Sequence, residues 1–253
     1  MREDVLIDDS SLDHILLLND DPQEKLNLYL VMKKIKPSTI LINGPVRFLA
    51  SEGKLKKAEE ERRYCDKTAE WFLKKAGLCY AKVKGGTSIA GDSSYYDKVY
   101  PSVFMVGRDK DALDKLVNAE TTDKIGEALG YPRKAIEKFV EKEKTGRLPG
   151  EEYKNKMIRY ASKNHRIPDW LAYISFIPES VNSKSAKDLG TKYMKYVREN
   201  NPQLASLVEE TFRTYFDCMV DEARKSEVVG GVDYKTCREP GRIDTRINTQ
   251  AAY

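Results

Sequence analysis

The stretch DKIGEALGYPRKAIEKFV (residues 123–140) marks the point at which the pattern of the chain changes. Two short helical patterns meet there at Gly130-Tyr131-Pro132, because glycine commonly ends helices and proline is favoured in a first helical turn. From Thr121 onward the chain is almost wholly helical in pattern. We therefore expect a helical hairpin with Gly130 in a left-handed conformation. Its common core would contain Ile125, Leu129, Ile136 and Phe139.

The half of the chain before residue 121 has a mixed pattern. Compact β-branched or aromatic runs predict three strands, in STILING (38–44), LCYAKVKGG (78–86) and YPSVFMVG (100–107). A charged helix is expected over Lys54–Ala76, with Gly77 as its stop signal. Other helix starts are predicted from cap residues. These are Ser10 or Ser11 for a short helix through Leu18, Asp21 with Pro22, Asp109 and Thr122.

The carboxy-terminal half predicts two further long helices. The segment KSAKDLGTKYMKYVREN (184–200) carries a short apolar stripe, and NPQLASLVEETFRTYFDCMVDEARK (201–225) carries a longer one, with Asn201 as its cap. The sequence thus predicts an α+β protein. It has a small mixed sheet of at least three strands in the amino-terminal half and a helical carboxy-terminal half packed on it. The expected regions are 1–120, 121–225 and a loosely held tail, 226–253.

Composition limits the compartment and the partners. The 253 residues include 44 basic and 40 acidic side chains, so the net charge of +4 does not by itself imply a polyanionic partner. The acidic start MREDVLIDDS lacks the layout of a secretory signal, and no apolar run is long enough to span a membrane. Cysteines 65, 79, 218 and 237 form no C-x-x-C motif, which is typical of reduced thiols. We expect a cytoplasmic protein without a membrane partner.

The hairpin also resembles a DNA-reading helix-turn-helix. Arg133 and Lys134 begin its second helix, where major-groove contacts are made, and Lys138 would follow the phosphates. Acidic residues share that helix and would repel phosphate, at Glu137, Glu141 and Glu143. A structural hairpin is favoured, so a nucleic-acid partner stays open without being the preferred interpretation.

The glycine-rich segment GGTSIAGDSSYYDK (85–98) is the second candidate site. Gly85 and Gly86 would expose backbone N–H groups to a phosphate, and Thr87 and Ser88 would add hydroxyl donors. The Lys-Ser/Thr ending of a P-loop is absent, and so is G-x-G-x-x-G. An ordinary loop between strands is the preferred interpretation.

Histidine is scarce: the chain has two, and only one of them stands in a polar cluster that could carry chemistry. His165 lies near Arg166 and Asp169 and is a weak catalytic candidate; a surface histidine before a turn is favoured. Cys218 falls in the apolar stripe, which makes a Cys–His pair unattractive. No histidine or cysteine has a ligand neighbour at metal-binding spacing, so we expect neither metal nor cofactor.

Three blocks of the chain resemble an uncharacterised, mostly archaeal family, domain of unknown function four-eight-three. They are VFMVGRDKDALDKL (103–116), IGEALGYPRKAIEKF (125–139) and IPDWLAYISFIPESVNSKSAKDLGTKYMKYV (167–197). The family pattern continues Leu-Gly-Tyr-Pro with two cysteines, where this chain has Lys134 and Ala135, and places two later cysteines where it has Phe176 and Ser180. The resemblance implies no known activity, and it implies that any metal site of the family is lost here.

Three functional hypotheses follow from these patterns. The leading one is a non-catalytic binding or scaffolding protein. The first rival is a DNA-binding regulator that uses residues 122–140, and the second is an enzyme acting on a phosphorylated small molecule through the glycine-rich segment and His165. The ligand, any reaction and the oligomeric state stay open.

Overall fold

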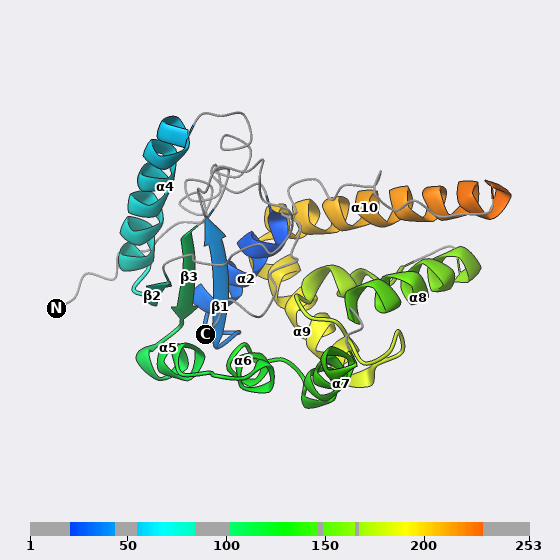
Figure 1. Cartoon of the computed structure of the whole chain (residues 1–253), viewed down its shortest axis with the longest axis horizontal. Helices are drawn as coiled ribbons and strands as arrows, with labels where there is room; N and C mark the ends of the chain where they lie inside the picture. The colour runs from blue at the N-terminus through cyan, green and yellow to red at the C-terminus, as the bar shows by residue number, and fades with distance from the viewer. Residues whose placement is uncertain (1–20, 44–54, 84–101, 146–148, 165–166, 230–253) are drawn as a thin grey trace. The chain divides into compact units, whose positions relative to one another are not determined.

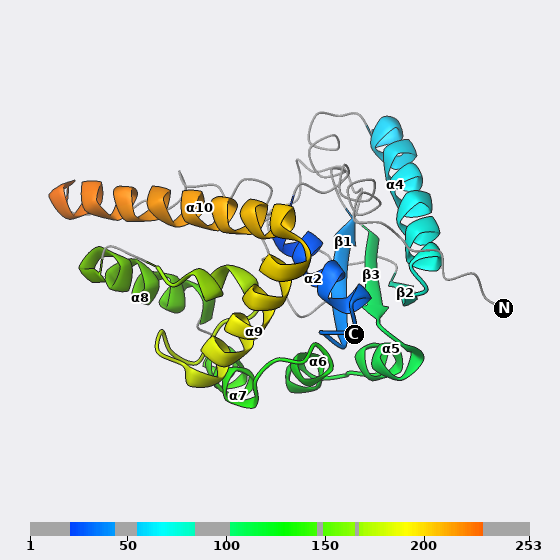
Figure 2. The same ribbon diagram turned by 180° about the vertical axis from the view of Figure 1, so that it is seen from behind.

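The computed structural model describes residues 21–43, 55–83, 102–145, 149–164 and 167–229, and Figures 1 and 2 show its elements from opposite sides. The chain divides into two compact units. Among the described residues, unit 1 contains Asn27–Leu129, and unit 2 contains Asp21–Leu26 together with residues 130–229. Strands lie in the amino-terminal half and most helices in the carboxy-terminal half, so the predicted α+β class is confirmed.

Unit 1 contains a three-stranded sheet of β1 (Ser38–Asn43), β2 (Cys79–Val83) and β3 (Ser102–Gly107). The order is β1-β3-β2, and Gly107 of β3 lies opposite Ser38 on one side and Cys79 on the other. Both pairs are antiparallel. The three predicted strands are confirmed, but the described sheet is antiparallel and not mixed, because β3 returns between two strands that share one direction.

Helix α4 (Leu55–Lys75) connects β1 to β2 and lies alongside the sheet, in contact with both strands (Figure 1). It ends as the sequence predicts: Gly77 has a φ of 65°, and the Leu78 N–H donates to the Leu73 carbonyl over 2.9 Å. The buried face of the helix repeats at helical spacing. It contains Cys65, Ala69, Phe72 and Leu73.

Polar contacts fix α4 to the sheet. The buried Asp66 carboxylate accepts a hydrogen bond of 2.6 Å from Lys82 Nζ on β2 and one of 2.8 Å from Ser102 Oγ on β3. The same Lys82 ammonium lies 3.6 Å from Glu70 Oε1. Both carboxylates in the middle of α4 are therefore directed to the sheet side of the helix.

Two of the helix caps predicted in the amino-terminal half are present as hydrogen bonds. At the start of α2 (Pro22–Met32), the Gln23 N–H donates to Asp21 Oδ1 over 2.8 Å. At the start of α5 (Lys110–Val117), the Ala112 N–H donates to Asp109 Oδ1 over 2.8 Å, and this bond lowers the pKa of the Asp109 carboxyl.

The next helix, α6 (Thr122–Ala128), begins one residue earlier than predicted. Thr121 is its cap residue and Thr122 its first helical residue, and the Thr121 side chain makes no capping bond to the backbone. Another contact fixes the end of α6. The Ser38 hydroxyl donates to the Ala128 carbonyl over 2.7 Å and links this helix to β1.

Gly130 separates α6 from α7 (Arg133–Lys144), and its φ of 76° confirms the predicted left-handed conformation. The boundary between the units falls between Leu129 and Gly130, so α6 belongs to unit 1 and α7 to unit 2. Leu129 and Ile136 are each buried, whereas Phe139 is half-buried. The common core of the hairpin stays a prediction.

Unit 2 continues with α8 (Pro149–Asn164), η1 (Asp169–Tyr173), α9 (Lys184–Asn200) and α10 (Pro202–Val229). Helices α8 and α10 lie side by side in both views. Two apolar clusters hold these elements together. One contains Met157, Trp170, Leu171, Ile174 and Ala186, and the other contains Ile158 and Met219.

Helix α10 follows its predicted stripe with two exceptions. The Leu204 N–H donates to Asn201 Oδ1 over 2.9 Å, which confirms the predicted cap. However, Leu207 and Cys218 are exposed. The placement of Cys218 in the stripe was wrong because the buried position belongs to Met219, which is turned by about 100° along the helix. The helix also runs on to Val229, past the predicted start of the tail at 226.

Candidate functional site

Arg133 and Lys138 of α7, two of the three predicted DNA contacts, are paired with carboxylates of the same helix. The Arg133 side chain is 88% exposed, and its Nε donates to Glu137 Oε1 over 2.8 Å. Lys138 Nζ lies 2.7 Å from Glu141 Oε2. Binding to DNA phosphates would have to displace these carboxylates, so the surface of α7 is a poor match for a polyanion.

The third residue, Lys134, lines a shallow open depression of about 240 Å³. The other lining residues are Glu179, Lys184, Ser185 and Asp188. Two ammonium groups and two carboxylates surround this space, so it carries no net charge that would select an anion or a cation. The depression therefore offers no charge selectivity for a ligand.

The Tyr131 side chain of the hairpin turn has a packing role. Its ring lies 5.0 Å from the Phe176 ring, and its hydroxyl donates to the Ser175 carbonyl over 3.3 Å. Burial raises the pKa of the Tyr131 hydroxyl. Phe176 stands at one of the positions where the resembled family pattern has cysteine, and here that position supplies an aromatic contact.

The remaining predicted candidates lie outside the described residues. These are Gly85, Gly86, Thr87 and Ser88 of the glycine-rich segment and His165. The predicted helix ending at Leu18 and residues 230–253 of the tail also lie outside them. Across the described segments, no group of three or more histidine, cysteine or acidic side chains is arranged to hold a metal ion. No helix in those segments combines the length and apolarity needed to cross a membrane.

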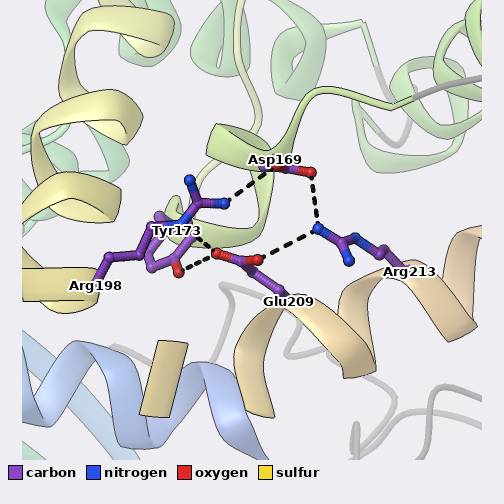
Figure 3. A network of polar contacts seen from close by, with 5 residues as sticks. All are labelled: Asp169, Tyr173, Arg198, Glu209 and Arg213. Atoms are coloured by element: carbon purple, nitrogen blue, oxygen red, sulfur yellow. Dashed lines mark hydrogen bonds and ion pairs between the residues drawn. The ribbon is translucent and has the colours of Figure 1, made fainter. Parts of the chain in front are cut away.

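A closed ring of charges joins η1, α9 and α10 (Figure 3). Arg198 contacts Glu209 over 2.7 Å and Asp169 over 3.2 Å, and Arg213 contacts the same two carboxylates, each over 3.3 Å. The Tyr173 hydroxyl adds a hydrogen bond of 2.7 Å to Glu209 Oε1. Two positive and two negative charges neutralise one another, so the ring fastens three elements together and leaves no excess charge for a ligand.

We expect Glu209→Gln to destabilise the protein by about 1–2 kcal/mol at neutral pH, because Arg198, Arg213 and Tyr173 lose their shared charged acceptor. Chemical denaturation at pH 7 measures the change. Glu199→Gln is the matched control, since Glu199 is 59% exposed and lies 4.0 Å from Lys195, and it should change stability by less than about 0.5 kcal/mol. Equal effects of the two substitutions would show that the ring does not stabilise unit 2.

The pH dependence of this contribution has a definite sign. Burial raises the pKa of Glu209, but the hydrogen bonds from Arg198 and Tyr173 outweigh it, and the folded-state pKa is lowered. The stabilisation is therefore complete above the unfolded-state pKa of about 4.3 and is lost as the pH falls through the folded-state value. The destabilising effect of Glu209→Gln should accordingly shrink in acid.

Lys36 is a buried titratable group that sequence patterns did not single out. Its side chain is fully enclosed, and Nζ donates to Asn27 Oδ1 over 2.7 Å. Burial lowers the pKa of the Lys36 ammonium to about 7. Lysines with such a pKa can act as nucleophiles. However, only 2% of the surface of Lys36 is exposed, so a substrate cannot reach its amine. We treat Lys36 as part of the core of unit 1.

The outward side of α4 carries two large exposed aromatic side chains. Tyr64 is 66% exposed and Trp71 is 54% exposed. They are seven residues apart, which is two helical turns, so both rings lie on one stripe about 10 Å apart along the axis. The only other large apolar side chains exposed among the described residues, Val117 and Leu207, lie singly on other helices. Neighbouring exposed aromatic side chains on one stripe, unlike single exposed ones, mark a candidate contact surface.

Three lysines accompany these rings at helical spacing. Lys67, Lys74 and Lys75 are all exposed, and within the described residues none of their ammonium groups is paired with a carboxylate. The nearest acidic residues along the helix, Asp66 and Glu70, contact Lys82 on the sheet side. We refer to the set Tyr64, Lys67, Trp71, Lys74 and Lys75 as the α4 outer face. It combines aromatic and cationic groups that are not already neutralised.

Sequence reasoning identified the buried stripe of α4 but missed its outer face. The signal was available, because the 3.6-residue period that places Leu73 inside also places Tyr64 and Trp71 together on the opposite side. The direction of the Asp66 and Glu70 side chains could not be predicted, because it is set by their contacts with Lys82, a residue of β2. Comparison of the chain with protein-family models, with curated proteins and with solved structures found no match to any of them.

Proposed function

We propose that this chain is a non-catalytic binding protein that holds an anionic partner on the α4 outer face. The observation that carries the proposal is the pairing of two exposed rings with three unneutralised lysines on one helix stripe. The opposite stripe anchors α4 through Phe72 and Leu73, which are almost completely buried. A rigid helix therefore presents these contact groups with little ordering required on binding.

The rival proposal is a regulator that reads duplex DNA through Arg133, Lys134 and Lys138. The ion pairs of Arg133 with Glu137 and of Lys138 with Glu141 weigh against it, because they cancel positive charge where phosphate would bind. No carboxylate of the described residues is paired with Lys67, Lys74 or Lys75, although the exposed Glu60 lies one turn before Tyr64 on the same stripe. The lysines of the α4 outer face therefore keep their charge, which is why we favour this face.

The same proposal places the protein in the cytoplasm. Its support is the absence of a C-x-x-C motif among the four cysteines and the exposure of Cys218, a thiol that would be prone to oxidation in an oxidising compartment. Membership of the mostly archaeal family that the chain resembles is likewise a proposal. It rests on the Leu129-Gly130-Tyr131-Pro132 turn and the Leu189-Gly190 pair.

Retention on immobilised heparin, a polyanion without bases, tests the proposed function. We expect the triple variant Lys67→Glu, Lys74→Glu, Lys75→Glu to elute at much lower salt than the wild type, because it reverses the charge of the α4 outer face. The control is Lys187→Glu, Lys192→Glu, Lys195→Glu on α9, which changes the net charge equally at exposed positions of unit 2. Equal losses in the two triple variants would assign retention to net charge alone and refute the proposal.

A further inference from the structure

We infer that the anionic partner of the α4 outer face is single-stranded nucleic acid, an inference that rests on the proposed function. Proteins that bind single strands combine cations that follow the phosphates with aromatic side chains on which bases stack. The α4 outer face has both, since Lys67 lies between Tyr64 and Trp71 in the sequence, and Lys74 and Lys75 follow them. The rings are exposed by more than half, which leaves room for a base against each.

The aromatic groups separate this partner from other anions. A peptide of acidic residues alone would satisfy the lysines but would leave Tyr64 and Trp71 without a matching planar group. In a duplex the bases are already stacked on one another inside the helix, so the rings would find no free base face. A membrane surface would require a broad apolar helix face, whereas the apolar side of α4 is buried through Phe72 and Leu73.

The charges determine how binding should respond to salt. Each phosphate neutralised on a single strand contributes about −0.7 to the slope of log K against log salt. Three phosphate contacts from Lys67, Lys74 and Lys75 therefore predict a slope of about −2. The two rings contribute binding that salt does not weaken, because stacking does not release counterions. Removal of the rings should lower affinity while leaving this slope nearly unchanged.

Trp71 also provides a direct spectroscopic signal. The chain has two tryptophans, and the other, Trp170, is buried in unit 2 with 7% exposure. A base that stacks on the Trp71 indole should quench its fluorescence, whereas a ligand that contacts only lysines should leave it nearly unchanged. The difference between wild type and Trp71→Phe isolates the Trp71 signal from that of Trp170.

The experiment is a titration of the full chain with fluorescently labelled oligo(dT) and oligo(U) of about 12 nucleotides, a length within the site size of single-strand binders. Fluorescence anisotropy is measured at several salt concentrations. We expect Tyr64→Ala and Trp71→Ala each to weaken binding by about tenfold or more, and Trp71→Phe to retain most of the affinity because it keeps a ring. Arg133→Ala with Lys134→Ala should leave binding unchanged. Denaturation midpoints equal to that of the wild type would show that the substituted side chains do not support the fold.

Other outcomes would overturn the inference in distinguishable ways. Binding of polyglutamate that depends on Lys67, Lys74 and Lys75, without binding of single strands, would exclude nucleic acid and leave the proposed function intact. Preferential binding of a duplex that is abolished by Arg133→Ala with Lys134→Ala would move the site to α7. Failure of both single strands and polyglutamate to bind, together with equal heparin retention of the two triple variants, would refute the inference and the proposed function together.

Discussion

The stability of the protein should rise as the pH increases from about 7 to about 10, and Lys36 should be responsible for the rise. The ammonium of Lys36 is enclosed in unit 1, and burial lowers its pKa from 10.5 to about 7. In the unfolded chain the same group titrates near its ordinary value of about 10.4. Between these values the unfolded state binds the extra proton, so raising the pH favours the folded state.

The magnitude of this effect follows from the size of the pKa shift. One pKa unit corresponds to about 1.4 kcal/mol, so the lowered pKa of Lys36 corresponds to a change of several kcal/mol across the window. Below pH 7 the lysine is protonated in both states and the cost of its burial is present in full. Only above about pH 11 is it neutral in both states, and there its contribution no longer changes with pH.

The measurement is the free energy of unfolding of wild type and Lys36→Met at intervals from pH 6 to pH 10. Methionine has a similar length and does not titrate, so the variant should lack the rise and should gain most on the wild type at pH 6. Lys36→Met also leaves the Asn27 amide oxygen without the hydrogen bond that it accepts from Nζ over 2.7 Å. Asn27→Leu combined with Lys36→Met removes both partners and corrects for that loss. Parallel pH profiles of wild type and Lys36→Met would show that Lys36 keeps an ordinary pKa in the folded protein.

Local signals in the sequence were sufficient for most elements of the fold. Asp21, Asp109 and Asn201 were recognised as caps from residue type and position, and each accepts the expected backbone N–H. Gly77 and Gly130 were recognised as helix ends, and both have positive φ. These features depend on a few neighbouring residues, which is why a single sequence reveals them.

Features that depend on distant residues were not predictable in the same way. The strand pairing places β3 between β1 and β2, and the pattern of each strand contains no information about its neighbours. The burial of Lys36 likewise depends on packing around it, and a lysine before Pro37 reads as an ordinary exposed residue. Within α10, periodicity located the apolar stripe correctly but did not define which residues border it. Cys218 was therefore assigned to the buried stripe, whereas its side chain is exposed.

The candidate site likewise combines features that neighbouring residues determine with features that distant residues determine. The rings of the α4 outer face follow from helical periodicity alone, whereas its positive charge follows from the contacts of Asp66 and Glu70 with Lys82. The basic residues of α7 and the carboxylates that oppose them were both visible in the sequence, and the geometry added which pairs form, Arg133 with Glu137 and Lys138 with Glu141. Counting charges along a helix therefore indicated that α7 is neutralised, but it did not indicate that the carboxylates of α4 are directed to the sheet side.

Gly190→Ala should destabilise unit 2 by about 2–3 kcal/mol, although alanine is the better helix former by about 1 kcal/mol. Gly190 lies within α9 where the backbone of η1 crosses it. A Cβ atom at this position would lie 2.6 Å from the Trp170 carbonyl oxygen and 2.9 Å from Trp170 Cε3. Ile174 Cγ2 would be 3.2 Å away. The Trp170 carbonyl belongs to the backbone, and the Trp170 indole ring is buried in the core. Neither group can therefore move without displacing η1.

Thr191→Ala is the matched control for this substitution, because Thr191 is the next residue of the same helix and is exposed. It should leave stability unchanged or raise it slightly through the higher helix propensity of alanine. Denaturant unfolding of the two variants, monitored by circular dichroism and by the fluorescence of the buried Trp170, measures both effects. A Gly190→Ala variant as stable as Thr191→Ala would mean that η1 and α9 do not approach as closely as 2.6 Å requires. The expected loss instead explains why a glycine follows Leu189 in the middle of a helix, where propensity alone disfavours it.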